Sequence, residues 1–164
     1  MHGARLSGET LLAEFHMLQT KVNVPEAWIA YLVPTRALVN QVTVRLRRDL
    51  ASLGLKVEQA SPALEVDVFE DELLQVADFD VLVTTPEKLD LLVRSGQTAL
   101  QPGGRLLGLV VADEAHNLGQ GERGLRMELL LALLNRESPD THFLLLTPFV
   151  PNADELARST DALA

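Results

Sequence analysis

The chain of 164 residues contains no cysteine, which excludes disulfide bonds, iron–sulfur clusters and thiolate metal sites. Aromatic side chains are scarce at 4% of the residues, although hydrophobic residues as a whole make up 47%. A core of leucine, valine and alanine is typical of parallel sheets that helices cover on both faces. The length is that of about one domain and is sufficient to bury an ordinary core.

Long apolar runs are also missing. No stretch reaches the roughly 18 apolar residues of a membrane span. The polar, glycine-containing start lacks the apolar core of a signal peptide. We therefore expect an intracellular, cytoplasmic protein with no membrane partner.

Basic residues are outnumbered, since 14 Lys and Arg stand against 23 Asp and Glu and give a net charge of −9. This balance argues against a protein that binds nucleic acid over its whole surface. A local basic patch remains compatible with it, and the best candidate comprises Arg36, Arg45, Arg47, Arg48 and Lys56. A charge cluster on a helix is more often a solvated face.

Strands and helices alternate along the sequence. Apolar runs predict strands at residues 27–33, 55–60, 81–84, 106–112 and 143–147. Periodicity and capping residues predict helices at residues 10–20, 36–53, 69–76, 121–135 and 152–158, and one that begins at Pro86. In the first helix, one face carries Leu11, Leu12, Phe15 and Leu18. The alternation indicates one domain over residues 1–164 with an α/β fold, a three-layer parallel sheet with helices on both faces.

The most informative segment is the apolar strand at residues 106–112, which runs directly into Asp113-Glu114-Ala115-His116. In open α/β sheets, ligands bind outside the carboxyl ends of the strands. There, one carboxylate could hold Mg²⁺ and its neighbour could activate a water molecule. The simpler alternative is an acidic turn at the end of a strand.

Three loops that follow predicted strands carry distinctive residues. They are Pro34-Thr35-Arg36-Ala37-Leu38, followed by Gln41, then Thr85-Pro86-Glu87-Lys88-Leu89, and then Asp113-Glu114-Ala115-His116. In this order they resemble motif Ia, motif Ib/Ic and motif II, the Walker B box, of the first RecA-like domain of superfamily 2 helicases of the DEAD/DEAH-box type. The resemblance implies the RecA-like fold of a P-loop NTPase.

The same resemblance implies an ATP-driven motor domain that uses ATP and Mg²⁺. In such a domain, Asp113 would reach the Mg²⁺ and Glu114 would position or deprotonate the attacking water. His116 would couple the site to a second RecA-like domain. The implied partner is DNA or RNA, as a single strand or a duplex end. Sequence does not distinguish the two, because such domains hold phosphates and sugars more than bases.

Contacts to nucleic-acid phosphates are implied at two predicted helix starts. Backbone N–H groups and the helix dipole favour an anion at such a position. Thr and Pro are also ordinary capping residues, so these segments could be helix caps, phosphate contacts or both. The residues concerned are Pro34, Thr35 and Arg36 at one helix start and Thr85, Pro86 and Glu87 at the other.

The phosphate-binding loop of the family, Gly-x-x-x-x-Gly-Lys-Ser/Thr, has a degenerate counterpart in this chain. Gly3 and Gly8 have the family's spacing, and Thr10 stands where a hydroxyl would reach Mg²⁺. Glu9 replaces the lysine, so a carboxylate would repel the negatively charged triphosphate. We expect weak or absent ATP binding unless another cation substitutes, and Arg5 is the nearest. The alternative is a frayed N-terminus with glycines at this spacing by chance.

The chain departs from the family pattern in other places. The first strand, which precedes the phosphate-binding loop in the family, has no residues here, so we expect a domain that is incomplete at its N-terminus. Motif III, normally Ser-Ala-Thr, is replaced by Thr147-Pro148-Phe149, which leaves Thr147 as the candidate for coupling hydrolysis to strand separation. We expect the second RecA-like domain to be absent, and without its arginine finger hydrolysis would be slow.

These observations leave several functions open. The leading hypothesis is an N-terminal motor domain, or a fragment of one, from an ATP-dependent helicase or translocase. The alternative is a degenerate helicase-like module without ATPase activity that binds nucleic acid or protein. A third hypothesis is a nucleotide phosphatase that uses Asp113 and Glu114 without a phosphate-binding loop. It is weaker, because the sequence shows no second cluster of metal ligands.

Overall fold

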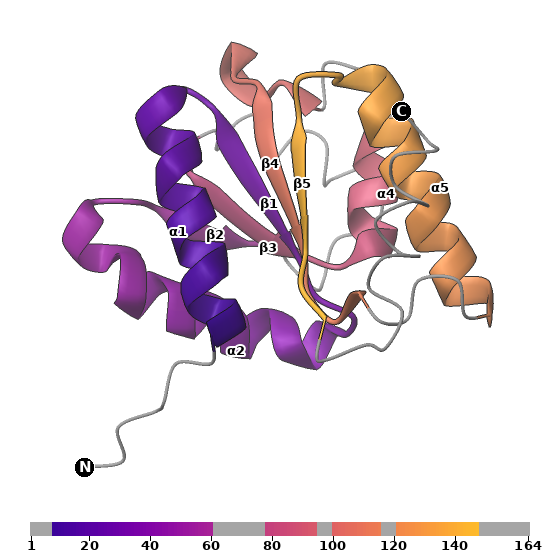
Figure 1. Ribbon diagram of the computed structural model, residues 1–164, viewed down its shortest axis with the longest axis horizontal. Coiled ribbons are helices and arrows are strands. Elements are labelled where there is room, and N and C mark those ends of the chain that lie inside the picture. The colour runs from indigo at the N-terminus through magenta and orange to yellow at the C-terminus, as the bar shows by residue number, and fades with distance from the viewer. Residues whose placement is uncertain (1–7, 61–77, 95–99, 116–120, 148–164) are drawn as a thin grey trace.

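A five-stranded sheet with the strand order β2-β3-β1-β4-β5 forms the centre of the molecule, and every neighbouring pair of strands is parallel (Figure 1). The computed structural model describes residues 8–60, 78–94, 100–115 and 121–147. The strands are β1 (Trp28–Leu32), β2 (Val57–Gln59), β3 (Val81–Thr84), β4 (Leu107–Ala112) and β5 (His142–Leu145). The helices are α1 (Gly8–Asn23), α2 (Arg36–Leu50), α4 (Pro86–Arg94) and α5 (Gly121–Glu137), with 3₁₀ turns at Ala51–Leu53 and Pro102–Gly104.

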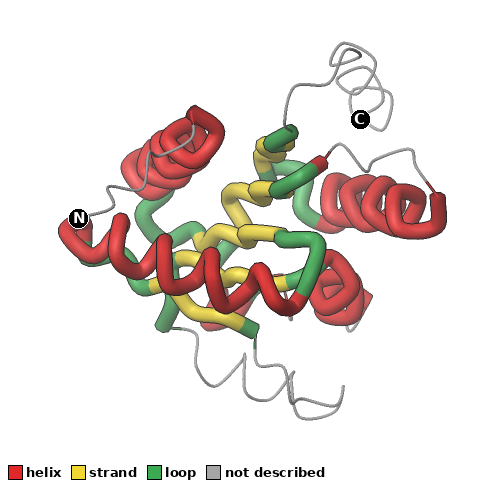
Figure 2. Tube along the Cα trace, turned by 90° about the horizontal axis from the view of Figure 1, so that it is seen from below, coloured by secondary structure: helices red, strands yellow, loops and turns green. Residues whose placement is uncertain are grey.

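Helices cover both faces of this sheet (Figure 2). α1 and α2 pack on one face, and α4 and α5 pack on the other. The five residues of β1 are all buried, because alternate side chains enter the two opposite layers. Trp28, Ala30 and Leu32 join the core beneath α4 and α5, whereas Ile29 and Tyr31 join the core beneath α1 and α2. The predicted three-layer α/β fold is confirmed.

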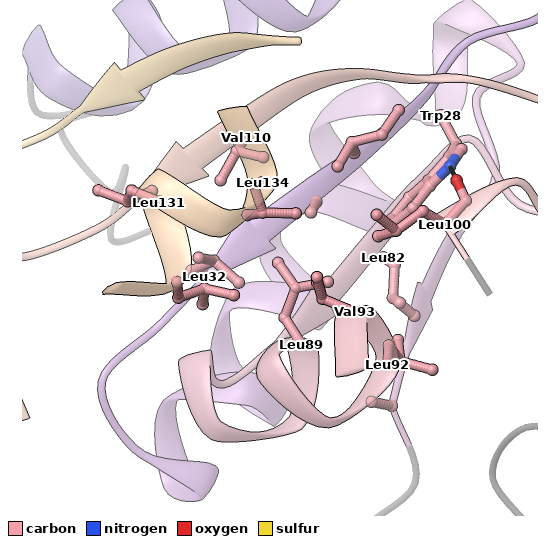
Figure 3. Packing of buried hydrophobic residues seen from close by; sticks show 14 of the residues in the cluster. Trp28, Leu32, Leu82, Leu89, Leu92, Val93, Leu100, Val110, Leu131 and Leu134 are labelled. Carbon is pink, nitrogen blue, oxygen red and sulfur yellow. Dashed lines mark hydrogen bonds between the residues drawn. The ribbon is translucent and has the colours of Figure 1, made fainter. Parts of the chain in front are cut away.

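The core between the sheet and α4 and α5 is mostly aliphatic (Figure 3). Leu89 of α4 and Leu134 of α5 belong to the same buried cluster as Leu32 of β1. Trp28 lies in this layer, and its indole N–H donates to the carbonyl of Leu100 at 3.0 Å. A buried polar group that keeps a hydrogen-bond partner avoids most of the cost of leaving water.

Most predicted elements are present, with ends that differ by up to three residues, and β3 has the predicted bounds. The helix predicted over residues 36–53 is α-helical only to Leu50, and a 3₁₀ turn completes it. Gly54 follows with φ +69°, the left-handed conformation that ends helices, and its N–H donates to the Ala51 carbonyl at 3.1 Å. The predicted helices at residues 69–76 and 152–158 lie outside the described residues. No helix in the described segments combines the length and apolarity that a membrane span needs.

The face that α1 turns towards the sheet differs from the predicted one. Leu11, Leu12 and Phe15 are exposed, whereas Ala13 and Met17 are buried. The reason is the close approach of this helix to β4. A Cβ added to Gly108 would lie 2.9 Å from the methyl group of Thr20 and 2.8 Å from the Cβ of Ala27. The close contact at Thr20 turns the face with Ala13 and Met17 towards the sheet. The hydrophobic pattern alone does not reveal this contact.

Candidate nucleotide and nucleic-acid site

The loops that carry the motif residues meet at one edge of the sheet, as predicted, because parallel strands have their carboxyl ends on the same side. Backbone hydrogen bonds continue the pairing beyond the strands. The N–H of Val33 donates to the carbonyl of Thr84 at 3.0 Å, and the N–H of Asp113 donates to the carbonyl of Leu32 at 2.9 Å. Asp113 is therefore fixed beside the segment that leads from β1 into α2.

The carboxylate of Asp113 is held by two donors. One oxygen, Oδ1, accepts the backbone N–H of Glu114 at 2.9 Å. The other, Oδ2, accepts the hydroxyl of Tyr31 at 3.2 Å. Burial raises the pKa of Tyr31, and the negative charge of Asp113 raises it further, so the phenol remains a donor at neutral pH. Each carboxylate oxygen keeps lone pairs for a further ligand.

Glu114 turns the chain sharply after β4. Its φ is +53°, which is uncommon for a residue with a side chain. The next N–H, that of Ala115, donates to the carbonyl of Leu146 at 2.7 Å, so the acidic turn is tied to the segment after β5. Thr147 follows directly in that segment. The half-buried Asp113 and the exposed Glu114 thus stand side by side with different access to solvent.

A cavity of about 450 Å³ opens beside this turn, between the starts of α4 and α5. It brings residues of three predicted motifs together, because Pro34, Pro86, Glu87, Asp113 and Glu114 all line it. The rest of its wall comes from the two helices and the turn: Asp90, Leu91, Ala115, Arg123, Gly124, Arg126 and Met127. The cavity is large enough for a small ligand beside the two carboxylates.

A second, smaller pocket of about 60 Å³ lies between α2, β2, β3 and α4. Arg36, Thr85 and Lys88 line it, so two of the predicted contact residues meet a lysine that the prediction missed. Burial lowers the pKa of Lys88, and the positive charge of Arg36 lowers it further. Lys88 follows Thr85 by three positions, a spacing that places two side chains on the same side of a helix. This spacing was the sequence signal that could have identified Lys88 as a neighbour of Thr85.

Polar groups without partners border this pocket. Asn40 and Gln59 line it beside Thr84, and neither was predicted. The side-chain oxygens of Gln59 and Thr84 are buried and have no hydrogen-bond partner among the described residues. Thr35 caps α2, since its hydroxyl accepts the N–H of Leu38 at 3.4 Å. The capping interpretation of Thr35 is confirmed, and a phosphate contact of the same residue stays a prediction.

Acidic neighbours pair with most of the candidate basic patch, which fits the alternative of a solvated, charged face. Arg47 pairs with Glu58 at 2.8 Å, Arg48 pairs with Asp49 at 2.8 Å, and Lys56 pairs with Asp78. Arg45 turns inwards, where its Nη2 donates to the Tyr31 hydroxyl at 3.3 Å. Such neutralisation is the expected result where acidic residues outnumber basic ones. Arg36, the remaining member of the candidate patch, lines the small pocket with Lys88, and Arg123 and Arg126 line the larger cavity.

The degenerate phosphate loop is only partly described. Gly8, Glu9 and Thr10 form the first turn of α1, where an acidic side chain suits the positive end of the helix dipole. Thr10 is buried and Glu9 is half-buried. Gly3 and His116 lie outside the described residues. No cluster of three or more acidic or histidine side chains that could hold a metal ion occurs in the described segments, whereas Mg²⁺ bound with a nucleotide needs one or two carboxylates.

Comparison with known proteins places the chain in a family. The sequence model of the DEAD/DEAH box helicases matches residues 6–156. Among curated proteins, the ATP-dependent DNA helicase Hel308 of Methanocella arvoryzae is 32% identical over 156 residues, which are 95% of this chain and 20% of that protein. Hel308 of Thermococcus kodakarensis is 33% identical over 95% of this chain and 13% of its own length. The chain thus spans about a fifth or less of these relatives.

Solved structures share the fold. The DUF1998 helicase MrfA bound to DNA has a TM-score of 0.76 at 21% identity, over 96% of this chain and 23% of that one. The Hef helicase domain of Pyrococcus furiosus has a TM-score of 0.68 at 20% identity, over 96% of this chain and 31% of that one. The parallel sheet with its motif-bearing edge has the RecA-like fold of these helicase domains. The family match covers nearly the whole sequence, and the chain belongs to the DEAD/DEAH box helicase family.

Proposed function

We propose that this chain is the first motor domain, or part of it, of an ATP-dependent DNA helicase or translocase. Its nucleotide site uses Asp113 and Glu114, and its nucleic-acid site uses Arg36, Lys88 and the starts of α2 and α4. The single observation that carries the proposal is the geometry of Asp113. Two donors fix its carboxylate at the carboxyl end of β4, beside the exposed Glu114 and a cavity of about 450 Å³.

The acidic pair fits Mg²⁺. Asp113 offers hard oxygen atoms that retain lone pairs, and Mg²⁺ prefers such ligands. ATP, when bound with Mg²⁺, supplies the phosphoryl group that is transferred to water. Glu114, exposed at the turn, is the group that would orient that water or accept its proton. Glu9 does not fit the phosphates, because a carboxylate occupies the place of the cation that normally neutralises them.

The pocket of Arg36 and Lys88 fits a backbone phosphate. Burial and the nearby positive charge of Arg36 lower the pKa of Lys88, and an anion bound between the two side chains would stabilise the charged form of Lys88. The starts of α2 and α4 border the same region, and helix N-termini favour anions. We infer DNA as the polymer because the Hel308 relatives are DNA helicases and the MrfA structure contains DNA.

Unwinding is proposed for the parent protein. The chain covers about a fifth of its Hel308 relatives, and motors of this class place further catalytic groups on a second RecA-like domain. The competing function is a module without ATPase activity that holds nucleic acid or protein. The observation that favours this alternative is Glu9 at the lysine position.

Calorimetric titration with Mg-ATP tests the proposal. We expect a dissociation constant in the high micromolar range, on the order of hundreds of micromolar, which corresponds to about 5 kcal/mol of binding free energy. Asp113→Asn weakens this binding, because the amide no longer carries the charge that Mg²⁺ requires. Equal heats in the two proteins, or no binding at millimolar Mg-ATP, would favour the module without ATPase activity.

A further inference from the structure

Tyr31, the one tyrosine of the sequence, lies buried in β1 between two charged groups. Its ring belongs to the core beneath α1 and α2. Its hydroxyl accepts a hydrogen bond from Nη2 of Arg45 at 3.3 Å and donates one to Oδ2 of Asp113 at 3.2 Å. Asp113 follows Tyr31 by 82 positions in the chain. The parallel pairing of β1 with β4, with Tyr31 opposite Val111, brings the two side chains together.

We infer that Tyr31 is a positioning residue for the Asp113 carboxylate, and that Arg45 acts on Asp113 through the Tyr31 hydroxyl. The inference rests on the proposed function, because it takes Asp113 to be the ligand of Mg²⁺. Tyr31 itself touches neither the metal nor the nucleotide in this account. It sets the orientation in which the carboxylate meets them.

The two anchors of the carboxylate come from different directions. A carboxylate with one anchor can rotate about the bond that joins it to Cβ. The backbone N–H of Glu114 holds Oδ1 at 2.9 Å, and the Tyr31 hydroxyl holds Oδ2. Because Mg²⁺ demands near-ideal octahedral geometry, a ligand whose plane is fixed in advance binds it with less loss of freedom. Outer-shell partners of this kind change metal affinity by roughly 10–100-fold when removed.

The charge of Arg45 also acts on Glu14 of α1. Burial raises the pKa of Glu14, the charge of Asp49 raises it further, and the charge of Arg45 opposes both. Within the part of the chain that the structure describes, the buried Nε of Arg45 has no hydrogen-bond partner, whereas its Nη2 donates to Tyr31. α1 begins at Gly8, within the degenerate phosphate loop. The charge of Arg45 therefore acts on Glu14 of this helix and, through the Tyr31 hydroxyl, on Asp113.

The test measures how strongly Mg²⁺ assists nucleotide binding. A fluorescent ADP analogue is titrated once in Mg²⁺ and once in EDTA. The readout, the Mg²⁺ ratio, is the dissociation constant in EDTA divided by the dissociation constant in Mg²⁺. We expect Tyr31→Phe, which removes one oxygen and keeps the ring, to lower this ratio about tenfold. The dissociation constant in EDTA stays unchanged. Arg45→Met lowers the ratio in the same direction, and the double variant is no worse than Tyr31→Phe, since Arg45 acts through Tyr31.

Thr43→Val is the matched control. It also removes a single buried hydroxyl beneath α2, one that donates to the Val39 carbonyl at 2.7 Å and does not touch Asp113. We expect a comparable change in thermal stability for Thr43→Val and Tyr31→Phe but an unchanged Mg²⁺ ratio in Thr43→Val. An equal loss of the ratio in both variants would assign the effect to general stability and would overturn the positioning role.

Asp113→Asn separates the two ways in which the inference can fail. If Asp113→Asn abolishes the Mg²⁺ ratio and Tyr31→Phe leaves it at the wild-type value, the positioning role is wrong and the proposed function stands. If Asp113→Asn has no effect, or if the wild-type protein shows no assistance by Mg²⁺, the proposed metal role fails and the positioning role fails with it.

Discussion

Glu9 is the residue that most distinguishes this chain from a working phosphate-binding loop. A glutamate in the first turn of α1 is favourable for the helix, because it complements the helix dipole. The same charge is unfavourable for a triphosphate, which needs a cation at that place. Helix stability and nucleotide binding therefore make opposite demands on one position, and in this sequence the residue present is the one that suits the helix.

Glu9→Lys tests this conflict. We expect the dissociation constant for Mg-ATP to fall at least about tenfold, roughly 1.4 kcal/mol, because a repulsion becomes an attraction. Glu9→Gln is the control, since it removes the charge without adding a cation and gives a smaller gain. Calorimetry measures both. An unchanged constant in Glu9→Lys would reject a formed phosphate-binding loop at residues 3–10 and leave the family assignment intact.

Some contacts of single residues can be predicted from the sequence, and others cannot. The strand at residues 81–84 and the acidic turn at Asp113 could be predicted, because each depends on neighbours in the chain. The bond from Tyr31 to Asp113 and the pocket that joins Gln59 to Lys88 depend on strand order, which a single sequence does not display. The tyrosine in the apolar strand β1 was the one local signal, since a buried hydroxyl needs a partner.

At the scale of elements, the closeness of α1 to the sheet decides which face is buried. Gly108 of β4 leaves room for Thr20 and Ala27, and this contact turns the face of α1 with Ala13 and Met17 towards the sheet. The periodicity of large apolar residues instead favours burial of the face with Leu11, Leu12 and Phe15. A hydrophobic pattern predicts that a helix packs against the sheet, but its distance from the sheet depends on a residue of another element.

Gly108→Ala tests this contact. We expect a loss of about 1–3 kcal/mol in the free energy of unfolding, because the added methyl group overlaps two neighbours. Denaturant titration measures the loss. Thr20→Ser removes one of the two overlapping methyl groups and keeps the hydroxyl that donates to the His16 carbonyl at 2.9 Å. The double variant should recover part of the loss, and a loss that is purely additive would contradict the proposed overlap.

Asp80 joins three elements at the opposite edge of the sheet. It pairs with Lys21 of α1 at 2.8 Å and with Arg105 at 3.3 Å, and it accepts the backbone N–H of Lys56 at 2.9 Å. Burial alone would raise the pKa of Asp80, but the hydrogen bonds from Lys21 and Lys56 and the two positive charges lower it overall. The charged form is therefore stabilised by folding.

Asp80→Asn should destabilise the protein by about 1–3 kcal/mol at neutral pH. Because the folded-state pKa is below the unfolded one, this contribution is present above the unfolded pKa and disappears as the pH falls through the folded pKa. Thermal unfolding of both proteins from pH 7 down to pH 3 checks this. Glu122→Gln, which breaks the exposed pair with Arg126, is the control and should cost less than about 1 kcal/mol. If the difference in stability between wild type and Asp80→Asn does not decrease as the pH falls, the ion pairs of Asp80 do not stabilise the folded protein in the proposed way.

At the scale of the whole molecule, a net charge of −9 is compatible with the proposed nucleic-acid partner if positive charge is concentrated locally. Arg47 and Arg48 of α2 pair with acidic neighbours, and Arg36 and Lys88 line the small pocket at the motif edge. A site with two cations predicts weak binding that depends only modestly on salt.

Fluorescence anisotropy with single-stranded DNA at several salt concentrations tests this site. We expect the logarithm of the affinity to fall with that of salt with a slope of roughly −1.4, about 0.7 for each of two phosphate contacts. Arg36→Ala and Lys88→Ala should each remove about half of that slope. Arg47→Ala is the matched control on the same helix, because its charge is already paired with Glu58. If Arg47→Ala reduces the salt slope as much as Arg36→Ala does, the phosphate contact lies elsewhere.

The central claim is that the carboxyl edge of this sheet holds the metal and its nucleotide at Asp113 and Glu114. Paramagnetic broadening of backbone amide signals by Mn²⁺-ATP tests it directly, because the effect falls steeply with distance from the metal. We predict that the amides of Asp113 and Glu114 broaden first and that the amide of Asp80, at the opposite edge, broadens last. Earlier broadening at Asp80, or at acidic positions such as Asp49 and Glu58, would contradict the claim.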